Sequence, residues 1–109
     1  MYVSVTGLKT KNLYASMKFW LLTIPAFRAA QKADGILLCE NNSRKGYKHT
    51  LTVWETKTHM LAYVRSPKHR KAMRAFPSIA SGRLLSYESD FIPTWDEALL
   101  KWEREARDG

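Results

Sequence analysis

The chain has 109 residues, enough for one domain with one modest hydrophobic core. With 45% hydrophobic residues, its composition is that of a folded globule and excludes a disordered chain. Lys and Arg number 18 against 10 Asp and Glu, so the formal net charge is +8 and the pI is near 9.8. This balance favours anionic partners such as nucleic acid, membrane surfaces or acidic ligands.

No stretch approaches the roughly 20 apolar residues that a transmembrane helix requires. The most apolar run, residues 19–24, is short and is followed by Pro25. Residues 1–11 lack the apolar region and the cleavage site of a signal peptide. The only cysteine, Cys39, cannot form an internal disulfide, and its being alone excludes zinc sites built on cysteine pairs. We therefore expect a cytoplasmic protein with no membrane span and no metal site.

The first predicted elements are a strand and a helix. Residues 2–6 alternate apolar and polar types, which predicts a strand that ends in a turn at Gly7. Asn12 is a candidate N-cap for the helix that follows. Pro25 lacks a backbone donor, so the helix should end, kink or restart there and stop at Asp34-Gly35. The apolar positions at helical spacing are Leu13, Met17, Trp20, Leu21 and Ile24.

The middle of the chain predicts a hairpin followed by a broken helix. Residues 36–39 form a short apolar run, and residues 40–46 are polar and rich in turn formers. Residues 47–54 are rich in β-branched types, alternate in character and end in a tryptophan, which predicts a strand. A helix over residues 57–76 follows, with a break near Ser66-Pro67.

The last third of the chain predicts a strand and a capped helix. Pro77 and Gly82 bracket the exit from the broken helix, and residues 83–88 predict a fourth strand. Thr94 with Glu97 three residues later forms a capping box at the start of a helix over residues 95–106. That helix places Leu99 and Trp102 on one stripe, with Ala98 beside them.

The predicted order is β-α-β-β-α-β plus a terminal helix, in one domain over residues 1–109. This is the split βαβ, ferredoxin-like α+β arrangement, an antiparallel sheet with helices on one face. The second face of such a sheet is uncovered, and His49, Leu51 and Val53 would supply it with apolar side chains that need a partner. We therefore expect a homodimer that packs sheet on sheet.

Several short motifs carry a family resemblance that covers most of the chain. Thr52-Val53-Trp54 ends the third strand, and an aromatic and small-residue first helix precedes it at Phe19-Trp20 and residues 26–30. Ser66-Pro67-Lys68-His69 with Ala72-Met73 opens the second half of the broken helix, and Pro93 to Ala98 opens the last one. In these motifs the chain resembles the dimeric α+β-barrel superfamily, which includes antibiotic-biosynthesis and heme-degrading monooxygenases. Within it, the chain looks most like the spheroidene-monooxygenase-like proteins and small related domains of unknown function.

The resemblance implies an oxidoreductase but fits heme degradation poorly. The pocket asparagine of the heme-degrading members would fall at Thr6 and Gly7, and their heme-ligating histidine would fall near Met73. His69, one helical turn earlier, matches a histidine-containing helix of the spheroidene-monooxygenase-like proteins and is the candidate heme ligand. The chain has no flavin or nicotinamide motif, so oxidation would use either a bound heme or the substrate's own reactivity with oxygen.

The candidate site is a pocket between the sheet and the helices, with Trp54 and His69 as candidate catalytic residues. His69, Met73 and Phe76 share one helix face by their spacing, and an apolar small molecule would suit such a lining. Each residue also has a structural interpretation, as a core aromatic, a core methionine or a partly buried histidine. The expected lining residues are Met17, Trp20, Trp54, His69, Met73 and Phe76.

Two alternatives remain open from the residues alone. Residues 65–75 carry five basic side chains and no acid, which would suit a non-catalytic ligand- or nucleic-acid-binding module, although such a run is often only a solvated face. The sheet lacks the aromatic pair of an RNA-recognition domain, so nucleic acid is the weaker interpretation. In the third interpretation side chains fill the pocket, and the domain serves only to dimerise.

Overall fold

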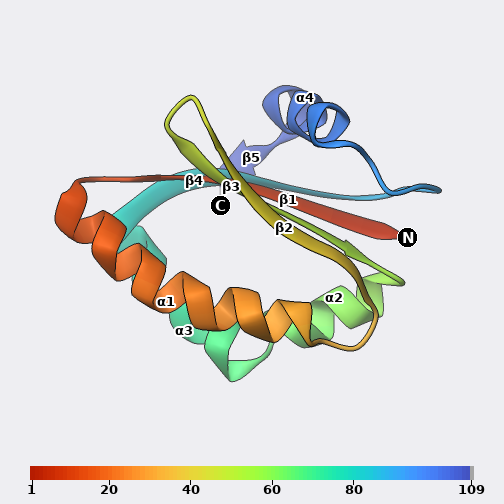
Figure 1. The fold of residues 1–109 in the computed structure, drawn as a ribbon, viewed down its shortest axis with the longest axis horizontal. Helices are drawn as coiled ribbons and strands as arrows, with labels where there is room; N and C mark the ends of the chain where they lie inside the picture. The colour runs from red at the N-terminus through yellow and green to blue at the C-terminus, as the bar shows by residue number, and fades with distance from the viewer. Residues whose placement is uncertain (109) are drawn as a thin grey trace.

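An antiparallel sheet with helices on both faces forms the fold in the computed structural model, which describes residues 1–108. Strands lie in the order β2-β3-β1-β4, and the two-residue β5 extends the sheet beyond β4. Helices α1, α2 and α3 cover one face, and α4 lies on the other (Figure 1). The predicted ferredoxin-like α+β class with a C-terminal helix is confirmed. The elements are β1 (Tyr2–Thr10), α1 (Leu13–Gln31), β2 (Ile36–Arg44), β3 (Tyr47–Trp54), α2 (Lys57–Val64), α3 (Pro67–Ile79), β4 (Ala80–Glu88), α4 (Trp95–Glu105) and β5 (Arg107–Asp108).

The register of the central strand sorts side chains onto the two faces. β1 pairs with both β3 and β4, so Val3 lies opposite Val53 and Tyr87, and Ser4 lies opposite Thr52 and Ser86. Successive side chains of a strand point to opposite faces. The odd-numbered positions of β1 and β3 therefore face α4, and the even-numbered ones face α1, α2 and α3.

Three strands are longer than the sequence predicts, and one of them, β4, begins at Ala80 and not at residue 83. Gly7 does not begin a turn but lies inside β1, where a Cβ atom would overlap the rings of Trp102 and His49. The glycine is needed for this close packing and not for a turn. β2 continues to Arg44, and a two-residue turn at Lys45 and Gly46 follows, with φ values of 52° and 82°. Two positive φ values suit the tight hairpin turns that match strand twist.

The helix starts are those the sequence predicts, whereas α3 does not end at residue 76 but runs through Pro77 to Ile79. The Asn12 side chain accepts a hydrogen bond of 2.8 Å from the backbone N–H of Ala15. Thr94 and Glu97 form the reciprocal capping box at the start of α4. The break at Ser66-Pro67 separates α2 from α3, with the proline at the first position of α3. Pro25 neither ends α1 nor restarts it, and the helix runs through it to Gln31.

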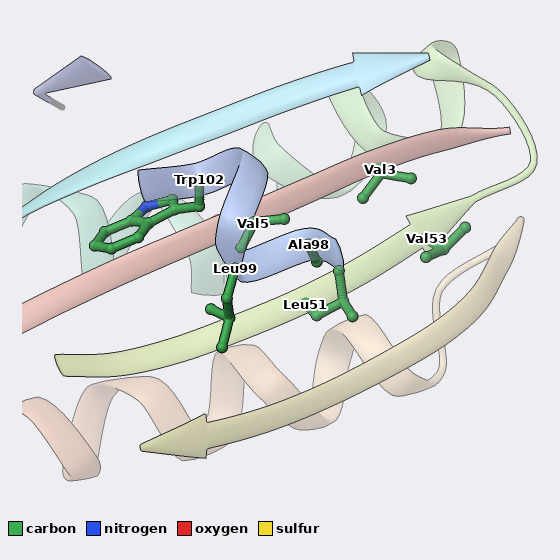
Figure 2. Packing of buried hydrophobic residues seen from close by; sticks show 7 residues of the cluster. All are labelled: Val3, Val5, Leu51, Val53, Ala98, Leu99 and Trp102. Carbon is green, nitrogen blue, oxygen red and sulfur yellow. The ribbon is translucent and has the colours of Figure 1, made fainter. Parts of the chain in front are cut away.

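One hydrophobic core lies between the sheet and α4. Val3, Val5, Leu51 and Val53 are fully buried beneath this helix. From α4, Ala98, Leu99 and Trp102 pack against them, and Figure 2 shows these seven side chains together. The Trp102 indole N–H donates a hydrogen bond of 2.9 Å to the backbone carbonyl of Arg83. Burying each aliphatic side chain of this kind stabilises the fold by about 1.5–3 kcal/mol.

The premise of the predicted sheet-on-sheet homodimer is wrong. His49, Leu51 and Val53 do share one face of the sheet, but α4 of the same chain covers them and leaves them at most 3% exposed. The sequence predicts the apolar set and the apolar stripe of α4 separately. It does not predict that the apolar stripe of α4 packs against the apolar set of the sheet.

No helix within residues 1–108 is both long enough and apolar enough to cross a membrane.

Candidate ligand-binding cavity

A cavity of about 180 Å³ lies between the sheet and helices α1, α2 and α3, on the face opposite α4. Its floor is formed by hydroxyl side chains of the central strands, which are Ser4, Thr6, Thr50 and Thr52. These positions alternate with the aliphatic residues that face α4. The walls come from the helices and are mainly aromatic and aliphatic, including Phe19, Leu22, Ala26 and Phe27 of α1, Met60, Tyr63 and Val64 of α2, and His69, Met73 and Phe76 of α3.

Trp54 lines this cavity at the end of β3. Its side chain is fully buried, and its indole Nε1 has no hydrogen-bond partner. A buried donor without a partner costs about 1–3 kcal/mol in stability. An indole nitrogen can only donate, so the group that satisfies Trp54 must accept a hydrogen bond, as a bound water or a ligand oxygen does.

His69 lines the same cavity from the first turn of α3. Burial lowers the pKa of its imidazole below the ordinary 6.5, and the backbone of Val64 opposes this shift to a smaller extent. The ring is therefore neutral at pH 7. Its Nδ1 is buried and makes no well-formed hydrogen bond. The hydroxyl of Ser66, one turn earlier, is likewise buried without one. A neutral imidazole in this setting can accept a proton or bind a polar atom of a ligand.

Tyr63 joins Trp54 to His69 and is a residue that the sequence interpretation missed. Its ring stacks on Trp54 at 5.3 Å between centroids and meets the His69 ring edge-on at 5.0 Å. Its hydroxyl donates a 2.8 Å hydrogen bond to the backbone carbonyl of Ala26. Burial, with a smaller contribution from Cys39, raises the pKa of Tyr63 to about 12, so the phenol stays protonated. Its spacing of three residues from the buried Met60 was the available sequence signal.

The structure brings four of the six expected lining residues together. Trp54, His69 and Phe76 line the cavity, and so does Met73, which is half-exposed at its edge. Met17 and Trp20 do not line it, with 62% and 39% of their surface exposed.

The rotation of helix α1 about its axis explains why Met17 and Trp20 lie outside the cavity. The buried face of α1 is formed by Ala15, Phe19, Ala26 and Ala30, which is nearly opposite the face that the sequence interpretation chose. Small side chains let the helix approach the sheet and α3 closely. The larger side chains at Met17 and Trp20 therefore point to solvent, and Phe19 lines the cavity in place of Trp20.

The remaining histidines and the cysteine serve other contacts. His49 lies on the α4 face, where its ring meets Trp102 edge-on at 4.7 Å. His59 and Thr56 share a 2.7 Å hydrogen bond at the start of α2. Burial is the main cause that raises the pKa of Cys39 to about 11, so it is a protonated thiol. In the part of the chain whose side chains the structure describes, residues 1–107, no three His, Cys, Asp or Glu side chains are grouped as a metal site.

The cavity does not fit a heme. A cavity of about 150 Å³ accommodates a single benzene ring, whereas a heme carries four pyrrole rings and two propionates. The observed 180 Å³ suits a molecule of one or two rings. The propionates would also need cations, and the guanidinium of Arg83, a cation of the lining, lies over the Trp102 ring on the α4 face instead.

The strand order, the helical layer and the cavity beneath it define the class of the fold. It is the ferredoxin-like fold of the antibiotic-biosynthesis monooxygenases, as the resemblance in sequence implied. No family model matches the chain, and no curated protein matches it in sequence.

Solved structures show the likeness in detail. A protein of Deinococcus radiodurans assigned as an antibiotic biosynthesis monooxygenase is 20% identical, with a TM-score of 0.72 over 86% of this chain and 97% of that one. SnoaB, a cofactor-independent oxygenase from Streptomyces nogalater, is 8% identical, with a TM-score of 0.68 over 84% and 94%. A protein of Nitrosomonas europaea with the same assignment as the first is 10% identical, with a TM-score of 0.73 over 84% and 100%. At these identities the likeness is one of fold.

Proposed function

We propose that the chain is a monooxygenase-like oxidoreductase that oxidises an apolar small molecule of one or two rings in the cavity, without flavin, nicotinamide or heme. The observation that carries this proposal is a pair of buried polar side chains, Trp54 and His69, in a cavity with a hydroxyl floor and mainly apolar walls. The Trp54 Nε1–H is a donor without a partner, and the neutral imidazole of His69 has one nitrogen that can accept. The chain shares its fold with a cofactor-independent oxygenase, which supports the proposal that the reaction uses no cofactor.

The chemistry must then balance without an external reductant. A substrate with an acidic CH₂ group beside a carbonyl can supply all the electrons, so that CH₂ and O₂ become C=O and H₂O. Two C–H bonds and the O–O bond break, one oxygen atom enters the product, and the other is reduced to water. In this proposal neutral His69 accepts the first proton, and Trp54 donates a hydrogen bond to the oxygen on which negative charge develops.

The test uses small ketones with an activated CH₂, such as 2-indanone and 2-tetralone, and no added cofactor. We expect oxygen uptake and one ¹⁸O atom from ¹⁸O₂ in the product. His69→Gln and Trp54→Phe should each lower the rate about 100-fold or more, in line with losses of a general base or an oxyanion donor. Trp20→Phe lies outside the cavity and should leave it unchanged.

Two results would count against the proposal. Oxygen uptake that survives both cavity variants would place the chemistry elsewhere. A Soret band that appears with hemin at one equivalent and is lost in His69→Gln would restore the heme version.

The homodimer and the cytoplasmic location stay predictions. Because α4 covers the sheet face, a second copy would have to pack on another surface. Light scattering after size-exclusion chromatography measures the mass directly.

A further inference from the structure

The outer face of α1 is apolar although none of the other side chains of residues 1–107 covers it. Six large side chains with exposed fractions between 39% and 79% lie on it, namely Leu13, Tyr14, Met17, Trp20, Leu21 and Ile24. At about 100° per residue these positions fall within one third of the helix circumference. The opposite third is the buried face with Ala15 and Phe19. A helix that is apolar on both sides exposes a patch that needs a partner.

The charges of the molecule are divided between its two faces. Residues 1–33 and 56–87, which supply β1, α1, α2, α3 and most of β4, contain no Asp or Glu and hold twelve of the eighteen Lys and Arg. On the outer side of α3, Arg70, Lys71 and Arg74 are all exposed. Acidic side chains gather instead on α4, on the other side of the sheet (Figure 1).

The ion pairs leave the cations of the helical layer free. Among the side chains of residues 1–107, the three ion pairs are Arg44 with Asp96, Lys45 with Glu103, and Lys101 with Glu105. All three involve an acid of α4. The basic residues of α1 and α3 therefore combine with the apolar row of α1 on one side of the molecule, with no negative charge between them.

We propose that this side of the molecule docks on an anionic membrane surface, with α1 lying in the plane of the interface. An interfacial helix buries apolar side chains at the boundary of the acyl chains, while Lys and Arg meet the acidic headgroups. Leu21 and Met17 supply the apolar side chains. Lys18 on α1 and the basic residues of α3 supply the positive charges.

The apolar row of α1 and the positive charges beside it disfavour two other partners for this surface, a second copy of the chain and a nucleic acid. A second copy placed face to face would bring like charges together across the contact. A nucleic acid would satisfy the cations but would leave the apolar row of α1 without a partner.

The experiment measures binding to vesicles by flotation. The full chain is mixed with vesicles of phosphatidylcholine alone, or of phosphatidylcholine with phosphatidylglycerol, at low and high salt. We expect binding to the anionic vesicles at least about tenfold tighter than to the neutral ones, and weaker at high salt.

Three variants separate the contributions. Met17→Ser with Leu21→Ser removes apolar contact without changing charge, and R70Q with K71Q and R74Q removes charge without changing the apolar row. Both should weaken binding to anionic vesicles about tenfold or more. Leu100→Ser with Arg104→Gln changes an exposed leucine and a cation on α4 and should leave binding unchanged. All these side chains are exposed, and unchanged melting temperatures check that the fold is intact.

Four outcomes would overturn the proposal. One is the absence of binding to anionic vesicles, and a second is equal binding to both kinds of vesicle. A third is tight binding to a 20-nucleotide single strand that is lost in the basic variant but kept in the serine variant, which would assign this side of the molecule to nucleic acid. The fourth is a dimer in light scattering that the serine variant dissociates, which would assign it to a second copy.

Discussion

The two faces of the sheet are built from alternate residues of the same strands, yet they differ in how completely they are packed. On the α4 face, Val3, Val5, Leu51 and Val53 pack against Leu99 and Trp102 (Figure 2). On the other face, hydroxyl side chains at Ser4, Thr6, Thr50 and Thr52 floor a cavity of about 180 Å³. The α4 face is therefore the more completely packed of the two, and the other face combines a second apolar cluster around Phe19 and Ile79 with buried polar atoms that lack partners.

The largest expected effect comes from breaking the packed face. Trp102→Ala should lower the free energy of unfolding by about 3–5 kcal/mol, because it removes a buried ring and its hydrogen bond to Arg83. Chemical denaturation measures the change. Trp20→Ala, at an exposed position of α1, is the control and should cost less than about 1 kcal/mol. Similar losses in both variants would contradict the contrast between the faces.

A smaller but substantial effect is expected from overfilling the same face. Gly7→Ala places a methyl group against Trp102 and His49 and should destabilise the fold by about 1–3 kcal/mol. The matched change on the cavity face is Ser4→Ala, where no such overlap occurs and about 1 kcal/mol or less is expected. The difference between the thermal midpoints of the two variants measures the loss of stability. Equal midpoints would show that α4 can shift away from β1.

The two buried tryptophans, Trp102 on the α4 face and Trp54 on the cavity face, allow a direct comparison of the two faces of the sheet. Trp102 has a satisfied N–H and Trp54 an unsatisfied one, and both are almost completely buried. Trp102→Phe leaves the Arg83 carbonyl without its partner, whereas Trp54→Phe removes an unpaired donor. With similar losses of ring volume, the first should cost about 1 kcal/mol more than the second. The opposite order in denaturant titrations would mean that the Trp54 N–H has a partner.

The smallest expected effect is a dependence on pH. Burial lowers the pKa of His49, partly offset by its hydrogen bond to the Thr6 carbonyl, and burial also lowers that of His69. Between the lowered values and 6.5, the unfolded chain binds more protons than the folded one. The stability that each neutral ring contributes is therefore present above pH 6.5 and is lost as the pH falls through the folded pKa.

Melting temperatures measured from pH 7.5 to 4.5 test this dependence. His49→Gln on the packed face and His69→Gln on the cavity face should each reduce the slope. If neither variant changes the slope, other groups control the response to acid.

Local signals predicted the helix starts well. Asn12, Thr94 with Glu97, and Pro67 act within one helical turn, so the sequence around each is sufficient to predict it. The edge strand β2 was predicted too short because its outer half, residues 40–44, is exposed and lacks the apolar alternation that marks a strand.

The cavity was predicted only in part, because its composition depends on helix rotation and on contacts between distant segments. Trp54 and His69 were found by type and spacing, but Tyr63 was not. Helix α1 is apolar all round, so periodicity does not select which face is buried, and Met17 and Trp20 were placed on the wrong side. Small residues at Ala15 and Ala30 decide the rotation, since they permit close approach.

The position of α4 has a consequence for truncated forms of the chain. A product that stops before Thr94 would lose β5 and the helix that contributes Leu99 and Trp102, and it would expose a broad aliphatic sheet surface to water. Such a fragment should be far less stable than the full chain and should aggregate or be bound by chaperones. The final helix thus shields from water the apolar side chains that the strands present on that face.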